Sequence, residues 1–209
     1  MIYRKDFITL PKDFPFNFYN SLVKAGREPV LHFHDCLEIN YVEEGSGVNI
    51  IENKQFELRP GDFYIINNLE HHHAFTDGYL RMKIIVFDPR FIWQNNPFDY
   101  EYLTPFYKRN IRFSNCVKKE NPFSGKLISI IEEIESEWIE KQEGYRMIIK
   151  ALLMKLLGVF YRHFKSNDEL GEDVIAFHKS YDRIRDVIEY INDNYEKNLT
   201  LLYNMSPKH

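Results

Sequence analysis

The amino-acid sequence predicts an α+β fold in which a small antiparallel β-barrel or β-sandwich comes first and helices follow. Between residues 30 and 87, short runs of alternating apolar and polar residues are separated by glycine, proline, asparagine and aspartate. That pattern is typical of strands joined by tight turns, and regular short strands favour a barrel or sandwich. From residue 122 onward, apolar residues recur at intervals of three and four, which indicates helices that pack by one face.

Within the predicted strands, histidines and a glutamate recur with a parity that places them on one face. His32, His34 and Glu38 are separated by even intervals, and side chains two residues apart in a strand point to the same side. His72 lies in a later run of three histidines at 71–73. These four side chains form the candidate ligand-binding site.

At these residues the sequence resembles the cupin family. The first cupin motif is matched at every spacing by Gly26, His32, His34, Glu38 and Gly45, and most of the second by the turn Pro60-Gly61-Asp62 followed by His72. The resemblance implies a double-stranded β-barrel, or jelly roll, whose three histidines and glutamate hold one divalent metal. Zn, Fe, Ni and Mn all suit such donors. The alternative is that these side chains bind one another or an organic ligand and hold no metal.

Aromatic and basic residues near the predicted barrel are further candidates for the ligand site. Three aromatic residues can supply a wall that stacks on a sugar ring, although such residues are often core: Tyr41, Tyr64 and Trp93. Three arginines are candidates for binding a carboxylate or phosphate of the ligand, because a guanidinium binds such groups through two hydrogen bonds: Arg27, Arg59 and Arg81.

Residues next to the four candidates have less certain orientations. Cys36 shares the strand parity of His34, so it could face the same side, but a small buried hydrophobe is its simpler role. His71 and His73 point away from the side of His72 in a regular strand. We therefore expect them at the rim or on the surface.

Composition and charge exclude several classes of protein. The chain has 44% hydrophobic and 28% charged residues, and its formal net charge of −4 gives no general attraction to nucleic acid. Cys36 and Cys116 lie far apart without a paired motif, so we expect free thiols. Neither a membrane-spanning nor a signal-like apolar run is present. We expect a cytoplasmic protein without membrane contact.

The first 25 residues combine several aromatic residues with Pro11 and Pro15. Because proline does not fit a regular helix, we expect an extended arm or edge strand laid over the barrel. Two roles remain open for its aromatic residues. They cover an open barrel end, or the arm closes over a bound ligand as a lid.

Two helices are expected after the barrel. The first carries an apolar stripe over residues 127–139, with Ser124 as a possible cap at its start and Gly144 at its end. The second runs over about residues 145–164 and has an apolar surface too wide for one neighbour. Part of that surface is either internal core or a dimer seam, and we expect the seam. Its residues are Leu152, Leu156 and Phe160.

A third helix is expected at about residues 181–195, after a polar linker. The sequence thus divides into a barrel with its N-terminal arm at residues 1–115, a helical dimerisation region at 116–170, and a linker with a terminal helix at 171–209.

The order of these parts resembles the AraC-type transcriptional regulators. The resemblance rests on the barrel, on the helical patterns at 131–145 and 151–153, and on the segment 184–201. It implies a barrel that binds a small-molecule effector, such as a sugar or related metabolite, and helices that form a homodimer. It also implies a C-terminal helix-turn-helix domain that binds DNA. Because the usual helix after Leu201 is absent, we expect only the truncated start of that domain here.

Two functions remain in competition. The first is the effector-sensing and dimerisation part of a regulator, which responds to its ligand by a population shift and needs no catalysis. The second is a metal-dependent cupin enzyme, a dioxygenase or isomerase, that uses the four candidate residues. A long helical half, which an enzyme barrel would not need, favours the regulator. We therefore expect a protein that is not an enzyme.

Overall fold

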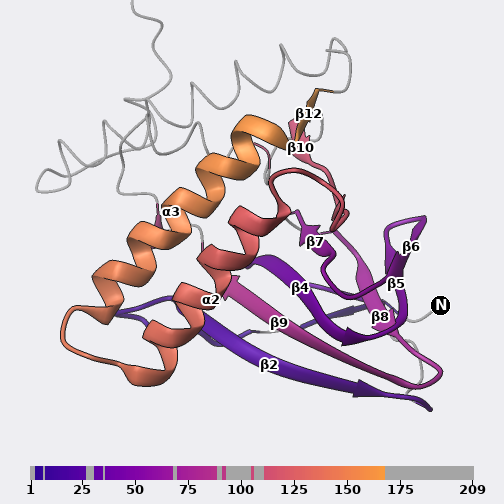
Figure 1. Ribbon diagram of the computed structural model, residues 1–209. Coiled ribbons are helices and arrows are strands. Elements are labelled where there is room, and N and C mark those ends of the chain that lie inside the picture. Colours follow the sequence, from indigo (N-terminus) through magenta and orange to yellow (C-terminus); the bar gives the residue numbers. More distant parts are fainter. Residues whose placement is uncertain are drawn as a thin grey trace, which may run out of the picture. The chain divides into compact units, whose positions relative to one another are not determined.

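The computed structural model describes residues 3–6, 8–26, 31–34, 36–67, 70–88, 91–92, 105 and 111–167. They form two five-stranded sheets and two helices, α2 (Ser124–Glu140) and α3 (Tyr145–His163), which cover the second sheet (Figure 1). This arrangement confirms the predicted cupin-like double-stranded barrel followed by a helical pair. Several sequence predictions lie outside the described residues: the terminal helix, the region 171–209, Arg27 and Trp93.

Each sheet combines strands that are distant in the sequence. The first sheet has the order β1-β3-β8-β5-β6 and the second the order β11-β7-β4-β9-β2. The strands of the first sheet are β1 (Tyr3–Lys5), β3 (Leu31–Phe33), β5 (Gly47–Ile51), β6 (Lys54–Leu58) and β8 (His72–Phe75). Those of the second sheet are β2 (Phe16–Lys24), β4 (Leu37–Gly45), β7 (Phe63–Ile66), β9 (Tyr79–Phe87) and β11 (Cys116–Val117). A short antiparallel pair consists of β10 (Ile111–Phe113) and β12 (Lys165–Asn167).

Side chains of the second sheet alternate between two environments. In β4, Leu37 and Ile39 belong to the large apolar cluster beneath the helices. Val42 belongs instead to the smaller cluster between the two sheets. Because successive side chains of a strand point to opposite faces, Glu38 and Asn40 share the face of Val42. The space between the sheets therefore holds polar side chains as well as an apolar core.

The two helices have nearly the predicted bounds but different caps. Ser124 begins α2, yet its hydroxyl donates a hydrogen bond to the carbonyl oxygen of Lys118 at 2.8 Å and does not cap the helix. The left-handed residue after α2 is Lys141, at φ 49°, whereas Gly144, at φ 86°, precedes α3. In the described part of the chain, neither helix has the length and apolar character needed to span a membrane.

The predicted dimer seam is part of the core. Leu152, Leu156 and Phe160 expose 7%, 0% and 0% of their surface, and all three pack in the cluster between α2, α3 and the second sheet. Because a single chain already covers them, they leave no apolar surface for a partner. The large apolar side chains that α3 does expose are Met147, Ile148 and Met154.

The N-terminal segment contains the expected edge strand, β2, which pairs with β9. Two of its aromatic residues, Phe14 and Phe16, pack beneath the helices. The ring centroid of Phe14 lies 4.9 Å from that of Phe91 and 6.4 Å from that of Trp138 on α2. Phe16 also packs on Trp138, at 5.5 Å. These two rings extend the core beneath the helices.

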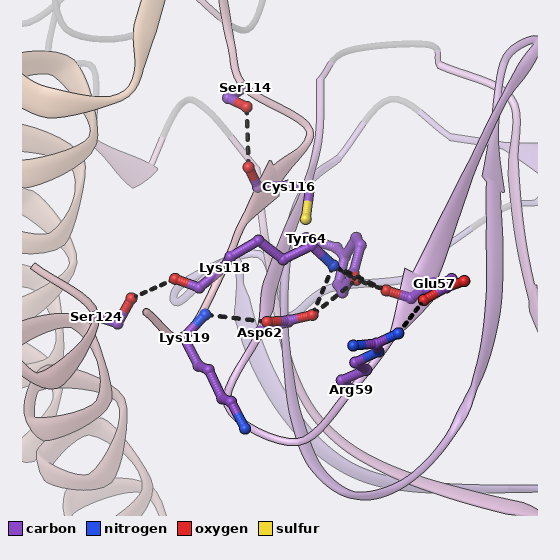
Figure 2. A network of polar contacts seen from close by, with 9 residues as sticks. All are labelled: Glu57, Arg59, Asp62, Tyr64, Ser114, Cys116, Lys118, Lys119 and Ser124. Atoms are coloured by element: carbon purple, nitrogen blue, oxygen red, sulfur yellow. Dashed lines mark hydrogen bonds and ion pairs between the residues drawn. The ribbon is translucent and has the colours of Figure 1, made fainter. Parts of the chain in front are cut away.

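A polar network joins the segment before α2 to the barrel (Figure 2). At its centre, the buried carboxylate of Asp62 accepts hydrogen bonds from Lys118 Nζ at 2.8 Å and from the backbone N–H of Lys119 at 3.0 Å. The hydroxyl of Tyr64 donates to the carbonyl oxygen of Glu57 and lies 3.3 Å from Asp62 Oδ2. The turn that ends at Asp62 thus anchors the chain that leads into the helices.

Candidate metal centre

Three histidines and one glutamate meet between the two sheets. His32 on β3 and His72 on β8 are directly opposed in an antiparallel pair, and their ring centroids lie 4.2 Å apart. His34 follows β3, with its ring centroid 5.1 Å from that of His72. One ring nitrogen of each histidine lies within 4.8 Å of the others. Glu38 on β4 reaches this cluster from the second sheet.

Backbone carbonyls orient two of the three rings. Nδ1 of His34 lies 2.9 Å from the carbonyl oxygen of Cys36, and Nδ1 of His72 lies 2.9 Å from that of Glu70. A carbonyl oxygen only accepts, so Nδ1 carries the proton in both rings. In the neutral rings, each Nε2 then presents its lone pair to the cluster. Metal-bound histidines have this arrangement, because their other ring nitrogen donates to a carbonyl or carboxylate.

The carboxylate of Glu38 is held between rings and an amide. Its Oε2 lies 3.0 Å from Nε2 of His34 and 3.7 Å from Nε2 of His72, and its Oε1 accepts a hydrogen bond from Asn40 Nδ2 at 2.7 Å. Burial alone would raise the pKa of Glu38, but the charge of His72 and the contact with His34 outweigh it and hold that pKa well below its usual value. An ionised carboxylate and an Nε2 lone pair are both acceptors. A contact of 3.0 Å between them therefore requires a proton or a metal cation.

His72 shows the same need for a positive charge. Its Nε2 is buried and has no hydrogen-bond partner in the described part of the chain. Burial lowers the pKa of His72, but the charge of Glu38 and the carbonyl of Glu70 raise it above the ordinary value. An unsatisfied buried polar atom costs about 1–3 kcal/mol, which a bound cation would remove.

The donor set fits a transition metal. Three imidazole nitrogens and one carboxylate suit Zn, Fe, Ni or Mn, and the preset tautomers of His34 and His72 point the correct nitrogen into the cluster. Of the described residues, the group with converging ligand atoms consists of the three histidines, and Glu38 adjoins two of them. From the sequence, spacing grouped His32, His34 and Glu38, whereas His72 was assigned by the resemblance to the second cupin motif.

The two described tyrosines of the predicted site lie on different faces. Tyr64 packs in the cluster between the sheets, but its hydroxyl is bound within the network around Asp62. Tyr41 packs on Phe63, with ring centroids 5.0 Å apart, against the core beneath the helices. Because odd and even positions of a strand point to opposite faces, the structure does not bring Tyr41 to the face of Glu38.

The two described arginines of the predicted site, Arg59 and Arg81, pair with glutamates at the surface. Arg59 pairs with Glu57 at 2.5 Å and Arg81 with Glu44 at 3.8 Å, and all four side chains are about half exposed or more. Such pairs are solvated and give no evidence of a ligand carboxylate or phosphate.

Of the three consecutive histidines, His72 is the one turned inward. The backbone N–H of His71 donates to Glu52 Oε1 at 2.8 Å, and its ring lies 3.2 Å from the same oxygen. The ring of His73 stacks on Phe75, with centroids 6.3 Å apart. His71 therefore lies at the rim, as its parity suggests, and His73 packs on the other face of β8 from His72.

Three supporting groups did not emerge from the sequence. Cys36 was considered for its side chain, but its backbone carbonyl is the group that lies 2.9 Å from Nδ1 of His34. Glu70 is buried, holds His72 through its carbonyl, and is itself fixed by Asn115 Nδ2 at 2.7 Å. Backbone carbonyls leave no signal in side-chain periodicity. Asn40, in contrast, has the parity of Glu38 and could have been found from it.

Comparison with known proteins gives a family and a group of relatives. The model of the family described as AraC-like ligand binding domain matches residues 26–157. The L-ectoine synthase of Rhodococcus erythropolis is 33% identical over 76 residues, which are 35% of this chain and 57% of that protein. That of Oceanobacillus iheyensis is 28% identical over 81 residues, 37% of this chain and 61% of that protein. The chain thus spans little more than half the length of these relatives.

Solved structures of similar proteins include the ectoine synthase of P. lautus. It is 26% identical with a TM-score of 0.34, and the match covers 38% of this chain and 59% of that one. A cupin 2 conserved barrel domain protein of Rhodopseudomonas palustris is 15% identical with a TM-score of 0.34, and the match covers 38% of this chain and 57% of that one.

The curated relatives correct the function predicted from the sequence. The order of barrel and helices predicts part of a transcription regulator that is not an enzyme. The curated relatives, however, are named as synthases, and they give no support to DNA binding or to a helix-turn-helix. The predictions of transcription regulation and of no enzyme activity are therefore wrong, and the second function considered from the sequence is the better one.

Proposed function

We propose that this chain, which belongs to the family of AraC-like ligand-binding domains, is a metal-dependent cupin enzyme that acts on a small molecule. One observation carries this proposal. Nε2 of His34 and Nε2 of His72 lie 3.0 Å and 3.7 Å from Oε2 of the buried Glu38, while Nδ1 of each ring is already used by a backbone carbonyl. A metal cation at this point satisfies all three groups at once.

The proposed ligands are His32, His34 and His72, with Glu38 as a fourth. A bound divalent metal supplies Lewis acidity to a coordinated substrate or water. The carbonyls of Cys36 and Glu70 hold the rings in the ligating tautomer. Asn40 donates to Oε1 of Glu38 and so fixes the direction of its other oxygen. The surrounding residues thus preorganise the donors.

The names of the relatives suggest which reaction to examine first. They are L-ectoine synthases, so we propose a ligand that is L-ectoine or a compound closely related to it. A synthase reaction then takes the place of the dioxygenase or isomerase considered from the sequence. Since the matched region is 57% of the first relative, the activity of that whole protein is a proposal for this chain.

Metal binding is tested on the purified chain by elemental analysis and by thermal unfolding. After treatment with a chelator, titration with Zn, Fe(II), Ni or Mn should raise the midpoint of unfolding and saturate at one ion per chain. At a free metal concentration one hundred times Kd, the expected stabilisation is about 2.7 kcal/mol. The variants His34→Ala and His72→Asn should lose the saturable response, whereas His71→Ala, a rim histidine of the same run, should keep it. An identical metal response in His34→Ala and the native chain would refute the proposed centre.

Catalysis is tested with L-ectoine itself, because a catalyst accelerates a reaction in both directions. The metal-loaded chain is incubated with L-ectoine, and its proton resonances are followed by NMR. We expect conversion that depends on the metal and is absent from His34→Ala. Conversion of L-ectoine that is equally fast in His34→Ala or without metal would contradict catalysis at this centre.

A further inference from the structure

We propose that Asn40 and Asn49 form a binding site for the N–H donor group of the substrate, next to the metal centre. This inference rests on the proposed function and extends it to the chemical class of the substrate. The group that fits carries two or more N–H donors, as an ammonium or amidinium does.

The strand registers place each asparagine near one side of the metal centre. On β4, Asn40 follows Glu38 by two residues and shares its face. On β5, Asn49 shares the face of Ile51, which pairs with His72 on the neighbouring strand β8, and Asn49 itself pairs with Ala74. Asn40 is therefore close to Glu38 on the second sheet, and Asn49 is close to His72 on the first. Both are buried, with 3% of their surface exposed.

Each asparagine has an acceptor without a donor. Asn40 Nδ2 donates to Glu38 Oε1 at 2.7 Å, and this contact fixes the amide because a carboxylate cannot donate in return. Oδ1 of Asn40 is thereby turned away from the carboxylate, and it has no hydrogen-bond partner in the described part of the chain. Oδ1 of Asn49 is likewise buried and unpartnered. Buried polar atoms are seldom left unsatisfied, so two such acceptors beside one centre indicate a missing donor.

The described cations nearby already have partners and do not serve the two amide oxygens. Lys83 is bound to Glu135 of α2, and Arg81 pairs with Glu44 at the surface. Lys118 lies beside the hydroxyl of Tyr64, the cross-strand partner of Asn40, but its ammonium is paired with Asp62. The donor that Asn40 and Asn49 require is therefore supplied from outside the described residues.

Two probes of the same shape test the proposal. Acetamidinium and acetate are planar and nearly isosteric, but the first presents only N–H donors and the second only acceptors. Each is titrated into the metal-loaded chain, and binding is followed by NMR shifts of the asparagine side-chain amides. We expect saturable acetamidinium binding at least tenfold tighter than acetate binding at these amides. Tighter acetate binding, or shifts in neither amide because the acceptors hold water only, would overturn the proposal.

Variants separate this site from the metal centre. Asn49→Leu removes an unpartnered acceptor without touching Glu38, and Asn49→Ala does the same should the larger side chain not fit. Both should weaken acetamidinium binding at least tenfold, keep metal affinity within about twofold, and leave the midpoint of thermal unfolding equal or higher when metal and probe are absent. Asn121→Leu, which removes an amide bonded to the backbone of Phe123, should leave binding of both the probe and the metal unchanged.

The outcomes distinguish the two proposals. Loss of acetamidinium binding with retained metal affinity supports the asparagine site. Unchanged acetamidinium binding in Asn49→Leu refutes the asparagine site but not the metal centre. A chain that binds no metal refutes the proposed function, and acetamidinium binding that still depends on Asn49 would then show that the acceptor site exists without it.

Discussion

Replacement of Asp62 by alanine is expected to lower the free energy of unfolding by about 2–4 kcal/mol, more than most substitutions of a polar residue. Asp62 has only 1% of its surface exposed. Its carboxylate contacts three groups: the backbone N–H of Lys119 at 3.0 Å, Nζ of Lys118 at 2.8 Å and the hydroxyl of Tyr64 at 3.3 Å. A hydrogen bond to a charged group contributes roughly 1.5–3 kcal/mol, which applies most fully to the backbone N–H of Lys119.

The other two contacts contribute less. The side chain of Lys118 is 48% exposed, so its ion pair is screened by water and contributes about 0–1 kcal/mol. Tyr64 keeps its hydrogen bond to the carbonyl of Glu57 after the substitution, and the contact with Asp62 is long. We therefore assign to it at most about 1 kcal/mol.

The assay is urea denaturation followed by far-ultraviolet circular dichroism, with Lys118→Met as the matched control. The control removes the ion pair but keeps the buried carboxylate and its backbone contact. It should lower the free energy of unfolding by less than about 1 kcal/mol. Equal losses in Asp62→Ala and Lys118→Met would refute the reasoning, since the exposed ion pair and not the backbone anchor would then dominate.

Two further predictions concern the barrel and its link to α2. Gly45 and Gly26 both have positive φ, but a Cβ at Gly45 would lie 2.1 Å from the Tyr79 carbonyl oxygen, whereas a Cβ at Gly26 meets nothing within 4 Å. Gly26→Ala should cost about 1 kcal/mol, and Gly45→Ala at least about 2 kcal/mol more, in urea denaturation; similar costs would contradict the predicted clash. Burial lowers the pKa of Lys83, but the hydrogen bond to Glu135 raises it by more, so the pKa lies above its ordinary value. The stabilisation from Lys83 is full below pH 10.5 and is lost as pH rises through the higher folded pKa. Between pH 9 and pH 12, the native chain should lose more stability than Lys83→Met, and parallel losses would count against this link.

The periodicity of the sequence predicted the helices and strands because the buried side chains of each element lie mainly on one face. α3 ends at His163, within one residue of the predicted end, since most of its apolar positions, from Ile149 to Phe160, face one core. Strand parity correctly grouped His32 with His34, but Glu38 reaches them from another strand of the other sheet, so the packing of the two sheets and not parity brings it there. The misplacement of Tyr41 ignored that rule, because an odd position in β4 faces the helices when Glu38 faces the other sheet.

The parts that could not be predicted depend on contacts between distant segments. Glu70 is held by Asn115, which lies 45 positions later in the sequence, and its carbonyl then fixes the tautomer of His72. Phe14 lies on the helical side because Trp138, more than one hundred positions later, offers it a stacking surface. Neither partnership follows from local spacing, because a period specifies which face is buried but not what covers it.

The helical pair bears on function in a way that the sequence did not suggest. A helical half appeared unnecessary for an enzyme barrel, and this argument favoured a regulator. In the structure, α2 and α3 cover the apolar face of the second sheet and bury Leu37 and Ile39 at 0% exposure. Without them that face would be a large exposed apolar surface, which folded chains rarely tolerate.

Because the helices cover one face of the second sheet, its two faces have different roles. Apolar burial beneath the helices stabilises the second sheet, so its other face is free to carry Glu38 and Asn40, which an apolar core would exclude. The smaller cluster between the sheets contains Val42 and Ile66 beside these polar groups. A barrel with an unsatisfied polar interior requires such an external core, whether it binds or catalyses. The helices are therefore compatible with an enzyme barrel, and their presence was no reason to predict a protein without catalysis.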